Sequence, residues 1–346
     1  MTGPSITLSK TAFFGNMNRA RELCGSGTAL MLAVKSNAYG HGMELISREA
    51  VSQGIDALAV LDLPTASAVR LCAPETPLLA WLLPPGQDYT EAVDSHIHLG
   101  VSTEGQLADI ARHQSSSPAI VHLKVDTGLN RNGATAKQWP NLVARAADLE
   151  DRGILRVHAV WSHLADTSVE TTKAALERLH DAASTAREAG LSPRTLHLAA
   201  SHALVDVPDA RLDMVRLGIL GYGVSPLSDR SAEDLGFAPV LSLYAPVLSS
   251  DDTTATLALG LGHGLLSPVS AGASLTVSGK SCIVRQVDID HTVIEQPTVR
   301  PLAPGDTVCV LGAGGVPVEQ WAQWCDTIGD EVLVRLRADI PRAWAD

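Results

Sequence analysis

Eight short runs of branched aliphatic residues recur through the first two-thirds of this chain, separated by segments with helical patterning. The clearest helix follows Thr167, where Thr167-Ser168-Val169-Glu170 matches a capping box and an apolar stripe continues to Gly190. The runs are Ala29–Val34, Asp56–Leu61, Pro77–Leu83, Ile97–Ser102, Ala119–Asp126, Val157–His163, Thr195–Ala200 and Met214–Tyr222. Because eight strands alternating with helices close a barrel, we predict a (β/α)8 barrel of the TIM type; an open doubly wound sheet is the alternative.

The pattern changes after Pro226, where short strand-like runs are separated by Gly, Pro, Ser and Asp turns. Helical periodicity is nearly absent there, apart from a helical turn near Val318–Trp324. The runs are Val240–Leu248, Thr254–Leu259, Ala273–Val277, Ser281–Val287, Thr292–Glu295, Thr307–Leu311 and Glu331–Arg337. We therefore predict a barrel domain at residues 1–230 and a mostly-β domain at 231–346, with the first few residues able to pack against the second domain.

Composition limits the partners and the compartment. A net charge of −12 argues against a nucleic-acid or anionic-membrane surface, while leaving room for a locally basic pocket. The five cysteines are odd in number and scattered, which is typical of reduced thiols in the cytoplasm. The polar start of the chain predicts no signal peptide, and no apolar run approaches the roughly 20 residues that span a bilayer. We expect a cytoplasmic protein that binds a small molecule.

A lone lysine, Lys35, ends the first aliphatic run and is followed at once by Ser36-Asn37-Ala38-Tyr39-Gly40-His41-Gly42, a polar turn. A partly desolvated lysine at the end of a buried strand can lose its proton near neutral pH and attack a carbonyl to form a Schiff base. A solvated lysine at a strand end is the simpler alternative.

Other polar residues lie at the ends of the later runs, just after them or, in the eighth run, within it, and barrel active sites collect at the carboxyl ends of the strands. They are Asp126, Arg131, His163, Ser201, Arg216 and Gly218. Each has an ordinary explanation when taken alone: a turn for Asp126, a helix cap for Ser201, an ion pair for Arg216. Their convergence on one face of a barrel points instead to a site.

Several blocks of sequence resemble the alanine racemase family of pyridoxal-phosphate enzymes (fold type III). The blocks are Ala33-Val34-Lys35-Ser36-Asn37-Ala38-Tyr39-Gly40-His41-Gly42, Val121–Gly133, Trp161-Ser162-His163, Val215–Gly223, Ile289-Asp290-His291, Pro304-Gly305-Asp306 and Pro341-Arg342. They occur in the family's order from residue 6 to 342. The resemblance implies pyridoxal 5′-phosphate as cofactor, an amino acid as substrate, no metal, and a homodimer in which the β domain completes the partner subunit's site.

The resemblance also implies roles for individual residues. Lys35 would bind the cofactor covalently and act as base on one face of the substrate. His163 would lie against the ring, and Arg216 would face the pyridine nitrogen and leave it unprotonated. Lys124, which many relatives carry as a carbamate, would orient Arg131 toward cofactor or substrate. The phosphate would be held by Tyr39, Ser201, Gly218 and Ile219, the last two through backbone N–H groups.

The chain departs from the family where the second base is expected. The family's second catalytic tyrosine corresponds to Leu261, its second phosphate-binding tyrosine to Asp330, and its substrate-binding methionine to Ile289. Leucine cannot transfer a proton, so we expect altered chemistry in place of standard alanine racemisation. His263 is the candidate replacement base, on the assumption that it shares a side of an extended strand with Leu261; a turn histidine without a role is the alternative.

Three outcomes remain open for the function. The first is a racemase-like isomerase with an altered second base. The second is a one-base lyase or transferase, for example a retro-aldolase, hydroxymethyl transferase, decarboxylase or transaminase. The third is a noncatalytic protein that binds pyridoxal phosphate.

Two further patterns suggest other classes of protein. His96-Ile97-His98 places two imidazoles at metal-ligand spacing, but at the start of a strand, away from the expected active face. Gly312-Ala313-Gly314-Gly315 is a weak nucleotide-binding pattern, because no long helix is expected after it. We regard both as alternatives to the pyridoxal-phosphate interpretation.

Overall fold

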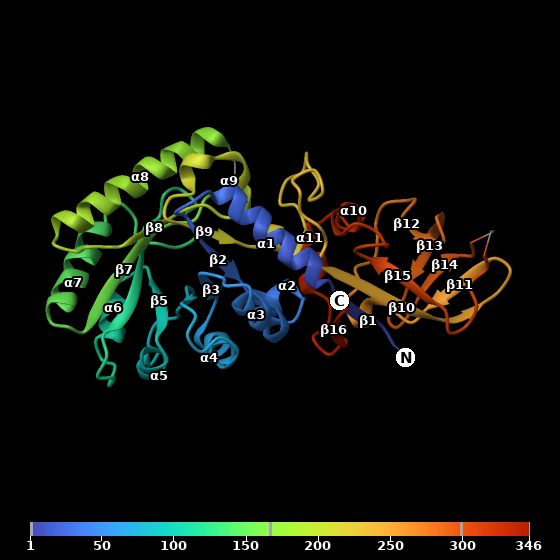
Figure 1. The fold of residues 1–346 in the computed structure, drawn as a ribbon, viewed down its shortest axis with the longest axis horizontal. Coiled ribbons are helices and arrows are strands. Elements are labelled where there is room, and N and C mark those ends of the chain that lie inside the picture. Colours follow the sequence, from blue (N-terminus) through green and yellow to red (C-terminus); the bar gives the residue numbers. More distant parts are fainter. Residues whose placement is uncertain (1–2, 166–167, 298–299, 346) are drawn as a thin grey trace. The chain divides into compact units, whose positions relative to one another are not determined.

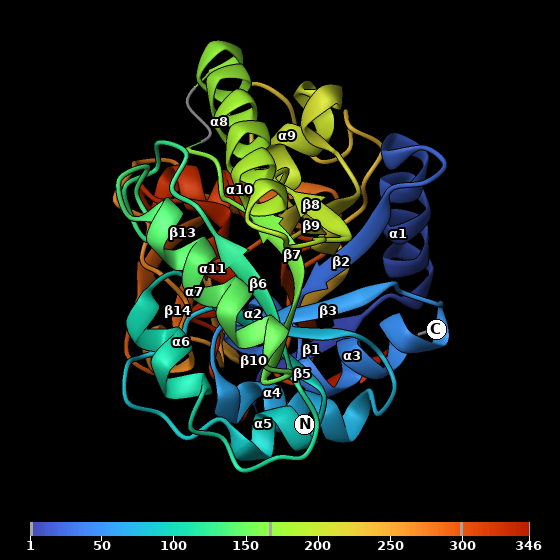
Figure 2. The same ribbon diagram turned by 90° about the vertical axis from the view of Figure 1, so that its left-hand side faces the viewer.

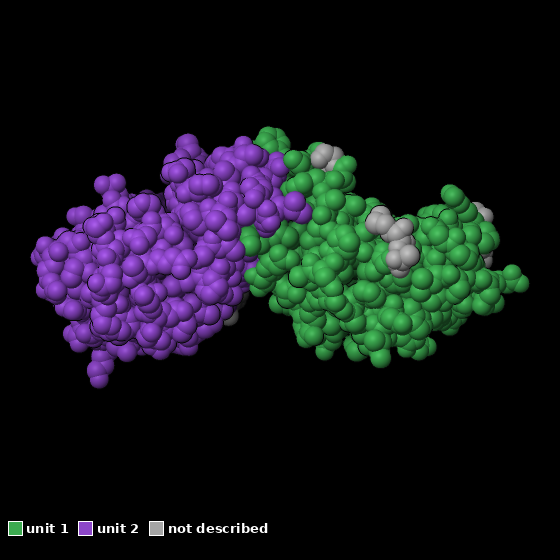
Figure 3. Space-filling view, turned by 90° about the horizontal axis from the view of Figure 1, so that it is seen from below, with its two compact units in different colours: residues 1–19, 36–43, 219–346 green, residues 20–35, 44–218 purple. Residues whose placement is uncertain are grey.

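The computed structural model describes residues 3–165, 168–297 and 300–345 (Figure 1). The chain forms two compact units, which are coloured in Figure 3. Unit 1 comprises Met1–Arg19, Ser36–Met43 and Ile219–Asp346, and unit 2 comprises Ala20–Lys35 and Glu44–Gly218. We describe each unit in turn; the domain limits expected from the sequence, 1–230 and 231–346, stay predictions.

Unit 2 contains a closed barrel of eight parallel strands, as Figure 2 shows from one side. The ring closes because the first strand, β2, pairs with both β3 and β9. The strands are β2 (Ala29–Ala33), β3 (Ala57–Val60), β4 (Leu78–Ala80), β5 (Ile97–Val101), β6 (Ala119–Lys124), β7 (Leu155–Trp161), β8 (Thr195–His197) and β9 (Met214–Leu217). Each lies within the predicted run or within two residues of it, so the barrel prediction is confirmed and the open-sheet alternative is excluded.

Helices alternate with these strands, and several begin at the caps that their sequences encode. The Asp62 carboxylate caps α4, and Thr103 and Gln106 form a capping box at α6. The helices are α3 (Met43–Ser52), α4 (Leu63–Cys72), α5 (Thr90–Asp94), α6 (Glu104–Ile110), α7 (Trp139–Asp151), α8 (Val169–Glu188) and α9 (Ser201–Asp206), with a 3-10 turn at Pro208–Ala210. The α8 cap is Ser168, paired with Thr171 instead of the predicted Glu170; Thr167 lies outside the described residues.

The barrel core differs between its two halves. On the side of β2, β3, β4 and β9 it is an apolar cluster made of Met31, Ala57, Ala59, Leu79 and Met214. On the side of β5 to β8, histidine side chains and Lys124 replace the aliphatic residues. A barrel normally fills its interior with branched aliphatic side chains. The polar half therefore requires a separate explanation.

Unit 1 is built on a mostly antiparallel sheet in the order β12-β13-β14-β11-β10-β1-β16, with β15 also pairing β10. Its strands are β1 (Ser5–Leu8), β10 (Leu241–Ser250), β11 (Thr254–Leu257), β12 (Ser274–Val277), β13 (Lys280–Val287), β14 (Thr292–Glu295), β15 (Thr307–Leu311) and β16 (Arg342–Trp344). Its helices are α10 (Val318–Trp324) and α11 (Gly329–Val334), with 3-10 turns at Ile219–Tyr222 and Leu261–His263. The helix α1 (Lys10–Cys24) and the left-handed turn labelled α2 (Lys35–Tyr39) contribute residues to both units.

The predicted strand Glu331–Arg337 is wrong. Residues 329–334 form α11, and the neighbouring residues Val332 and Leu333 are both buried, which suits one face of a helix and not an alternating strand. The Thr327 hydroxyl donates to the Glu331 carboxylate at the start of this helix. The helical turn expected at Val318–Trp324 is confirmed as α10.

Candidate active site

A buried arginine organises the carboxyl ends of three neighbouring strands in unit 2. Arg216, in β9, is only 6% exposed. Its guanidinium donates to His197 Nδ1 at 2.9 Å, to His163 Nδ1 at 3.0 Å, and to the carbonyls of Ser162 and Leu198 at 2.9 Å each. Because a guanidinium has no acceptor, both histidines must accept at Nδ1 and carry their protons on Nε2. The network thus fixes the tautomers of both rings.

Burial keeps these rings neutral. It lowers the pKa of His163 to about 2, and the charges of Arg216, Arg131, Lys124 and Lys35 act in the same direction. The pKa of His197 lies well below its usual value, first because of burial and then because of Arg216. His163 therefore presents an N–H donor, and it is not a group that takes up protons near neutral pH.

Lys35 follows the last buried residues of β2, between β3 and β9. The Val34 N–H donates to the Ala59 carbonyl at 2.9 Å, which extends strand geometry to the residue before the lysine. Lys35 itself is half-buried. On the neighbouring strand, the Gly218 N–H donates to Ser201 Oγ at 3.1 Å, so Ser201 and Gly218 are brought together as expected.

Lys124 ends β6 and is 3% exposed. Its Nζ contacts Asn132 Oδ1 and lies 4.5 Å from the centre of the Trp161 ring. Burial lowers the pKa of Lys124 to about 7, and the charges of Arg216 and Arg131 contribute. A large share of this amine is therefore neutral at neutral pH. By contrast, the Asp126 carboxylate accepts the N–H groups of Gly128 and Asn130, which supports the turn interpretation.

In unit 1, the segment after the lysine forms a left-handed turn. The backbone φ angles of four successive residues, Ser36, Asn37, Ala38 and Tyr39, lie between 51° and 56°. Residues other than glycine rarely adopt this left-handed region. Tyr39 is buried with its ring 5.2 Å from that of Tyr222. Burial and the Asp330 carboxylate raise the pKa of Tyr39, so its hydroxyl stays protonated.

Contacts within unit 1 hold this turn in place. Arg342 Nε donates to the Gly40 carbonyl at 2.8 Å. The Gly40 Cα lies against the Leu333 carbonyl, where any Cβ would collide with the oxygen. Backbone strain of this kind persists where the surroundings impose it, and it is common at functional sites. Ile219, the remaining predicted phosphate residue, opens the 3-10 turn that carries Tyr222.

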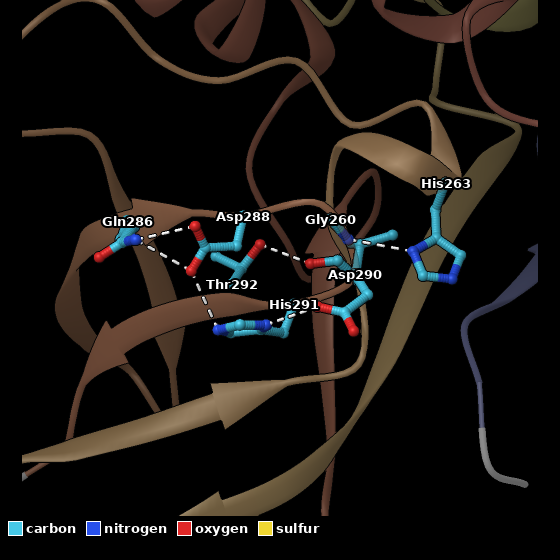
Figure 4. A network of polar contacts seen from close by, with 8 residues as sticks. Gly260, His263, Gln286, Asp288, Asp290, His291 and Thr292 are labelled. Carbon is cyan, nitrogen blue, oxygen red and sulfur yellow. Dashed lines mark hydrogen bonds and ion pairs between the residues drawn. The ribbon is translucent and has the colours of Figure 1, made fainter.

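Two of the three residues that depart from the family, Leu261 and Ile289, lie on exposed turns of unit 1, and the third, Asp330, lies partly buried in α11. Leu261 is 46% exposed and Ile289 is 75% exposed. The Leu261 N–H donates to the Asp288 carbonyl at 2.8 Å, and the Gly262 N–H donates to the Ile289 carbonyl at 2.6 Å. His291 bridges Asp288 and Asp290 beside them (Figure 4). The two turns thus support each other through their backbones.

The structural assumption behind His263 is wrong, because Leu261–His263 forms a 3-10 turn and not an extended strand. Residues two apart do not share a side in such a turn. His263 Nδ1 accepts the Gly260 N–H at 3.1 Å, as Figure 4 shows, so the neutral ring carries its proton on Nε2. In this arrangement His263 offers a donor and lacks a free lone pair for a base.

The two alternative patterns, His96–His98 and Gly312–Gly315, do not form the metal-ligand pair or the nucleotide-binding turn that they suggested. His96 is exposed on a turn with φ of 51°, whereas His98 lies in β5. The two imidazoles therefore do not form the expected pair on one face of a strand. His98 instead meets His122 and His158 from neighbouring strands. Gly312–Gly315 forms a tight turn, with the Gly315 N–H donating to the Gly312 carbonyl at 2.9 Å, and the short helix α10 starts only at Val318.

Sequence reasoning missed His197, which links Arg216 to the barrel interior. The available signal was a histidine inside a run that should point aliphatic side chains inward, as also at His98 and His122.

Among the residues that the structure describes, no helix is long and apolar enough to cross a membrane.

A closed parallel barrel with a strand-end lysine and a buried arginine, together with an antiparallel β unit, defines the class of fold-type III pyridoxal-phosphate proteins. Residues 8–226 match the family described as alanine racemase, N-terminal domain, and residues 245–344 match alanine racemase, C-terminal domain. The chain belongs to the alanine racemase family, whose members are pyridoxal 5′-phosphate enzymes.

Individual relatives agree over nearly the whole chain. The alanine racemase of Thermobifida fusca is 35% identical over 347 residues, which cover 92% of each protein. That of Streptomyces coelicolor is 32% identical over 369 residues, covering 97% of this chain and 94% of the relative. The crystal structure of alanine racemase from D-cycloserine-producing Streptomyces lavendulae superposes with a TM-score of 0.93 at 28% identity, covering 100% of this chain and 98% of that one.

Proposed function

We propose that this chain is a pyridoxal-phosphate enzyme that acts at the α-carbon of an amino acid, with proton transfer altered on one face. The observation that carries the proposal is the combination of an intact donor set in the barrel with a leucine at position 261. The barrel residues supply the groups needed to bind pyridoxal phosphate. Leu261, which stands where the second base of two-base racemisation is expected, cannot transfer a proton.

The residues in the barrel fit the cofactor chemically. Lys35 offers an amine at a strand end, and Arg216 offers a buried guanidinium held by four hydrogen bonds. Ser201, whose Oγ accepts the Gly218 N–H, offers a neutral hydroxyl donor suited to a phosphate, and the Gly218 N–H would turn from Ser201 to the phosphate when the group binds. These residues, together with Tyr39 and Ile219, would hold the group. When bound, pyridoxal phosphate supplies an electron sink for the pair left at the α-carbon.

The chain's own residues would transfer the proton, hold the cofactor ring and orient the substrate. Lys35 would remove or return a proton on one face of the α-carbon. Arg216 would donate a hydrogen bond to the ring nitrogen without giving up a proton, since guanidinium stays charged at any working pH. His163 would pack against the ring as a neutral imidazole, and Arg131 would orient the substrate.

The second face is where we expect the difference from standard racemisation. Leu261 is inert, and His263 has its Nδ1 lone pair engaged by Gly260. We therefore favour chemistry that relies mainly on the Lys35 face. Deuterium exchange in D₂O decides the question: holoenzyme is incubated with separate L- and D-amino acids, including β-hydroxy and α-methyl ones. Exchange or cleavage confined to one enantiomer supports the proposal, whereas equal exchange and inversion from both would refute it.

His263→Ala is expected to change the exchange rates of both enantiomers by less than about 3-fold, because a ring whose lone pair is occupied contributes little as a base. Deuterium incorporation followed by mass spectrometry measures the rates. His291→Ala, which changes another histidine of the same two turns, serves as the matched control. Loss of one direction only in His263→Ala would establish His263 as the replacement base.

We also propose a homodimer in which each site is completed by the partner subunit's β domain. The support is a group of exposed apolar side chains in unit 1: Leu261 at 46%, Ile289 at 75% and Ile328 at 65%. Large exposed apolar side chains of this kind often mark an interface. Light scattering coupled to size exclusion should give a dimer mass, and Ile289→Asp should shift it toward monomer with loss of turnover. A monomer with full turnover would contradict this proposal.

A further inference from the structure

A row of histidines fills the polar half of the barrel interior. Strands β5, β6, β7 and β8 contribute His98, His122, His158 and His197, one from each strand. His98 Nδ1 lies 3.0 Å from His122 Nε2, and His122 Nδ1 lies 3.0 Å from His197 Nε2. The rings of His122 and His158 are 5.1 Å apart. Such a row connects Arg216 to the opposite end of the barrel.

Arg216 sets the direction of the hydrogen bonds in this row. It donates to His197 Nδ1, so the His197 proton must sit on Nε2 and donate to His122 Nδ1. His122 then carries its proton on Nε2 and donates to His98 Nδ1. One hydrogen, bonded to His122 Nε2, therefore lies between the two nitrogens, and a metal ion that replaced it would be faced by a lone pair from each ring.

A third imidazole nitrogen is available next to this pair. His158 Nδ1 is buried and has no hydrogen-bond partner among the described residues. One nitrogen from each of His98, His122 and His158 lies within 4.8 Å of the others. A buried polar atom without a hydrogen-bond partner lowers the stability of the folded state, and a ligand bound to His158 Nδ1 would remove this cost.

We propose that His98, His122 and His158 form a binding site for a late first-row divalent cation of the zinc class. The ion replaces the hydrogen between His98 Nδ1 and His122 Nε2 and takes His158 as a third ligand. His98 and His158 would bind as neutral imidazoles and His122 as an imidazolate. Nitrogen ligands of this kind suit zinc, copper or nickel, and three protein ligands leave one position open for water.

The chemistry and the access of the site are consistent with this assignment. Burial lowers the pKa of His98 to about 3 and the pKa of His122 and of His158 below the usual value, so all three rings are neutral, with one N–H each, at neutral pH. Tetrahedral coordination at 2.0–2.1 Å sets the nitrogens about 3.4 Å apart. Small side-chain rotations would therefore close the cluster. His98 and His158 are half-buried, so the ion can enter from their side.

Binding at this site releases one proton. His122 keeps accepting from His197 on Nδ1, so its Nε2 proton, the only proton on its nitrogens, has to leave when the metal bond forms. The ring then binds as an imidazolate, whose negative charge is shared between the divalent ion and the hydrogen bond from His197. The balance is one divalent ion taken up and one proton given to solvent per chain. The ion is then joined through His122 and His197 to Arg216.

The test uses full-length, tag-free holoenzyme treated with chelator and then titrated with Zn²⁺. Calorimetry in two buffers of different ionisation enthalpy should give one ion and about one proton per chain. Cobalt(II) as a second probe should develop the strong visible bands of a four-coordinate site. His98→Gln and His158→Gln should each weaken Zn²⁺ binding at least about 100-fold, since even outer residues of a metal site contribute 10- to 100-fold.

His180→Gln is the matched control, because His180 is an exposed histidine on α8 and should keep wild-type uptake. No uptake by the wild type in excess Zn²⁺, or equal uptake by all three variants, would overturn the site. Uptake without proton release would remove His122 from the ligand set. If a variant fails to fold, the proton count and the cobalt spectrum of the wild type decide. None of these measurements depends on the proposed catalytic activity.

Discussion

Lys35→Ala is expected to lower turnover by about 10⁴-fold or more and to abolish covalent retention of pyridoxal phosphate. The amine is the only group at the end of β2 that can form the covalent link, and it is also the proposed base. Removing it takes away two functions at once, while β2 and its pairing with β3 and β9 remain. Because the side chain is half-buried at a strand end, we expect the free energy of unfolding to change little.

Borohydride reduction followed by peptide mass spectrometry identifies the lysine that carries the cofactor. Lys124 is the informative rival, because its pKa of about 7 makes it a second nucleophilic amine in the same barrel. Cofactor fixed on Lys124, or retained covalently in Lys35→Ala, would contradict the assignment. Lys173→Ala, on the exposed surface of α8, controls for the loss of a lysine elsewhere and should leave turnover unchanged.

The barrel was predictable because its strands are short aliphatic runs bounded by helical segments. Local sequence largely determines such elements: β2 and β5 begin at the predicted residues, Ala29 and Ile97. In the sheet of unit 1, Thr292–Glu295 and Thr307–Leu311 have the predicted limits. The misread segment, Glu331–Arg337, contains Val332, Leu333 and Val334, whose side chains suit a strand. Its helical state depends on burying Val332 and Leu333 together, which is a tertiary effect. The pairing partners of β1 and β16 lie far away in the sequence and gave no local signal.

The candidate site was predictable to the extent that its residues end strands. Lys35, Ser201 and Gly218 follow that rule, whereas Arg216 lies within β9. The turn at Ser36–Tyr39 could not be predicted, because four successive non-glycine residues in the left-handed region contradict local preference. The histidine row could not be assembled either, since its members come from four different strands. Only the closed barrel makes them neighbours.

The two halves of the barrel interior suggest how one fold separates stability from chemistry. The aliphatic half supplies ordinary packing, and the histidine half holds Arg216 through a chain of fixed tautomers. A guanidinium anchored in this way cannot rotate toward other partners without breaking several buried hydrogen bonds. Arg216 is therefore well suited to hold one orientation throughout a reaction.

Leu261→Tyr is expected to raise the rate of racemisation by about 10²-fold, at the lower end of what a positioned acid-base group contributes. A phenol at this position would restore the acid-base group that the resemblance to the family implies and that Leu261 lacks. The substitution is structurally mild, because Leu261 is 46% exposed and the backbone of its turn is held by the carbonyls of Asp288 and Ile289. We therefore expect the free energy of unfolding to change by less than about 0.5 kcal/mol, as for most exposed positions.

The matched control is Leu261→Phe, which adds the same ring without the hydroxyl and should give no gain. Interconversion of L- and D-amino acids is followed by chiral chromatography, and solvent deuterium incorporation reports proton transfer on each face. A gain that needs the hydroxyl and appears as exchange from the previously silent enantiomer identifies the missing second base as the cause of altered chemistry. If Leu261→Tyr and Leu261→Phe behave alike in folded holoenzyme, the barrier lies elsewhere. The proposal that position 261 limits racemisation then fails.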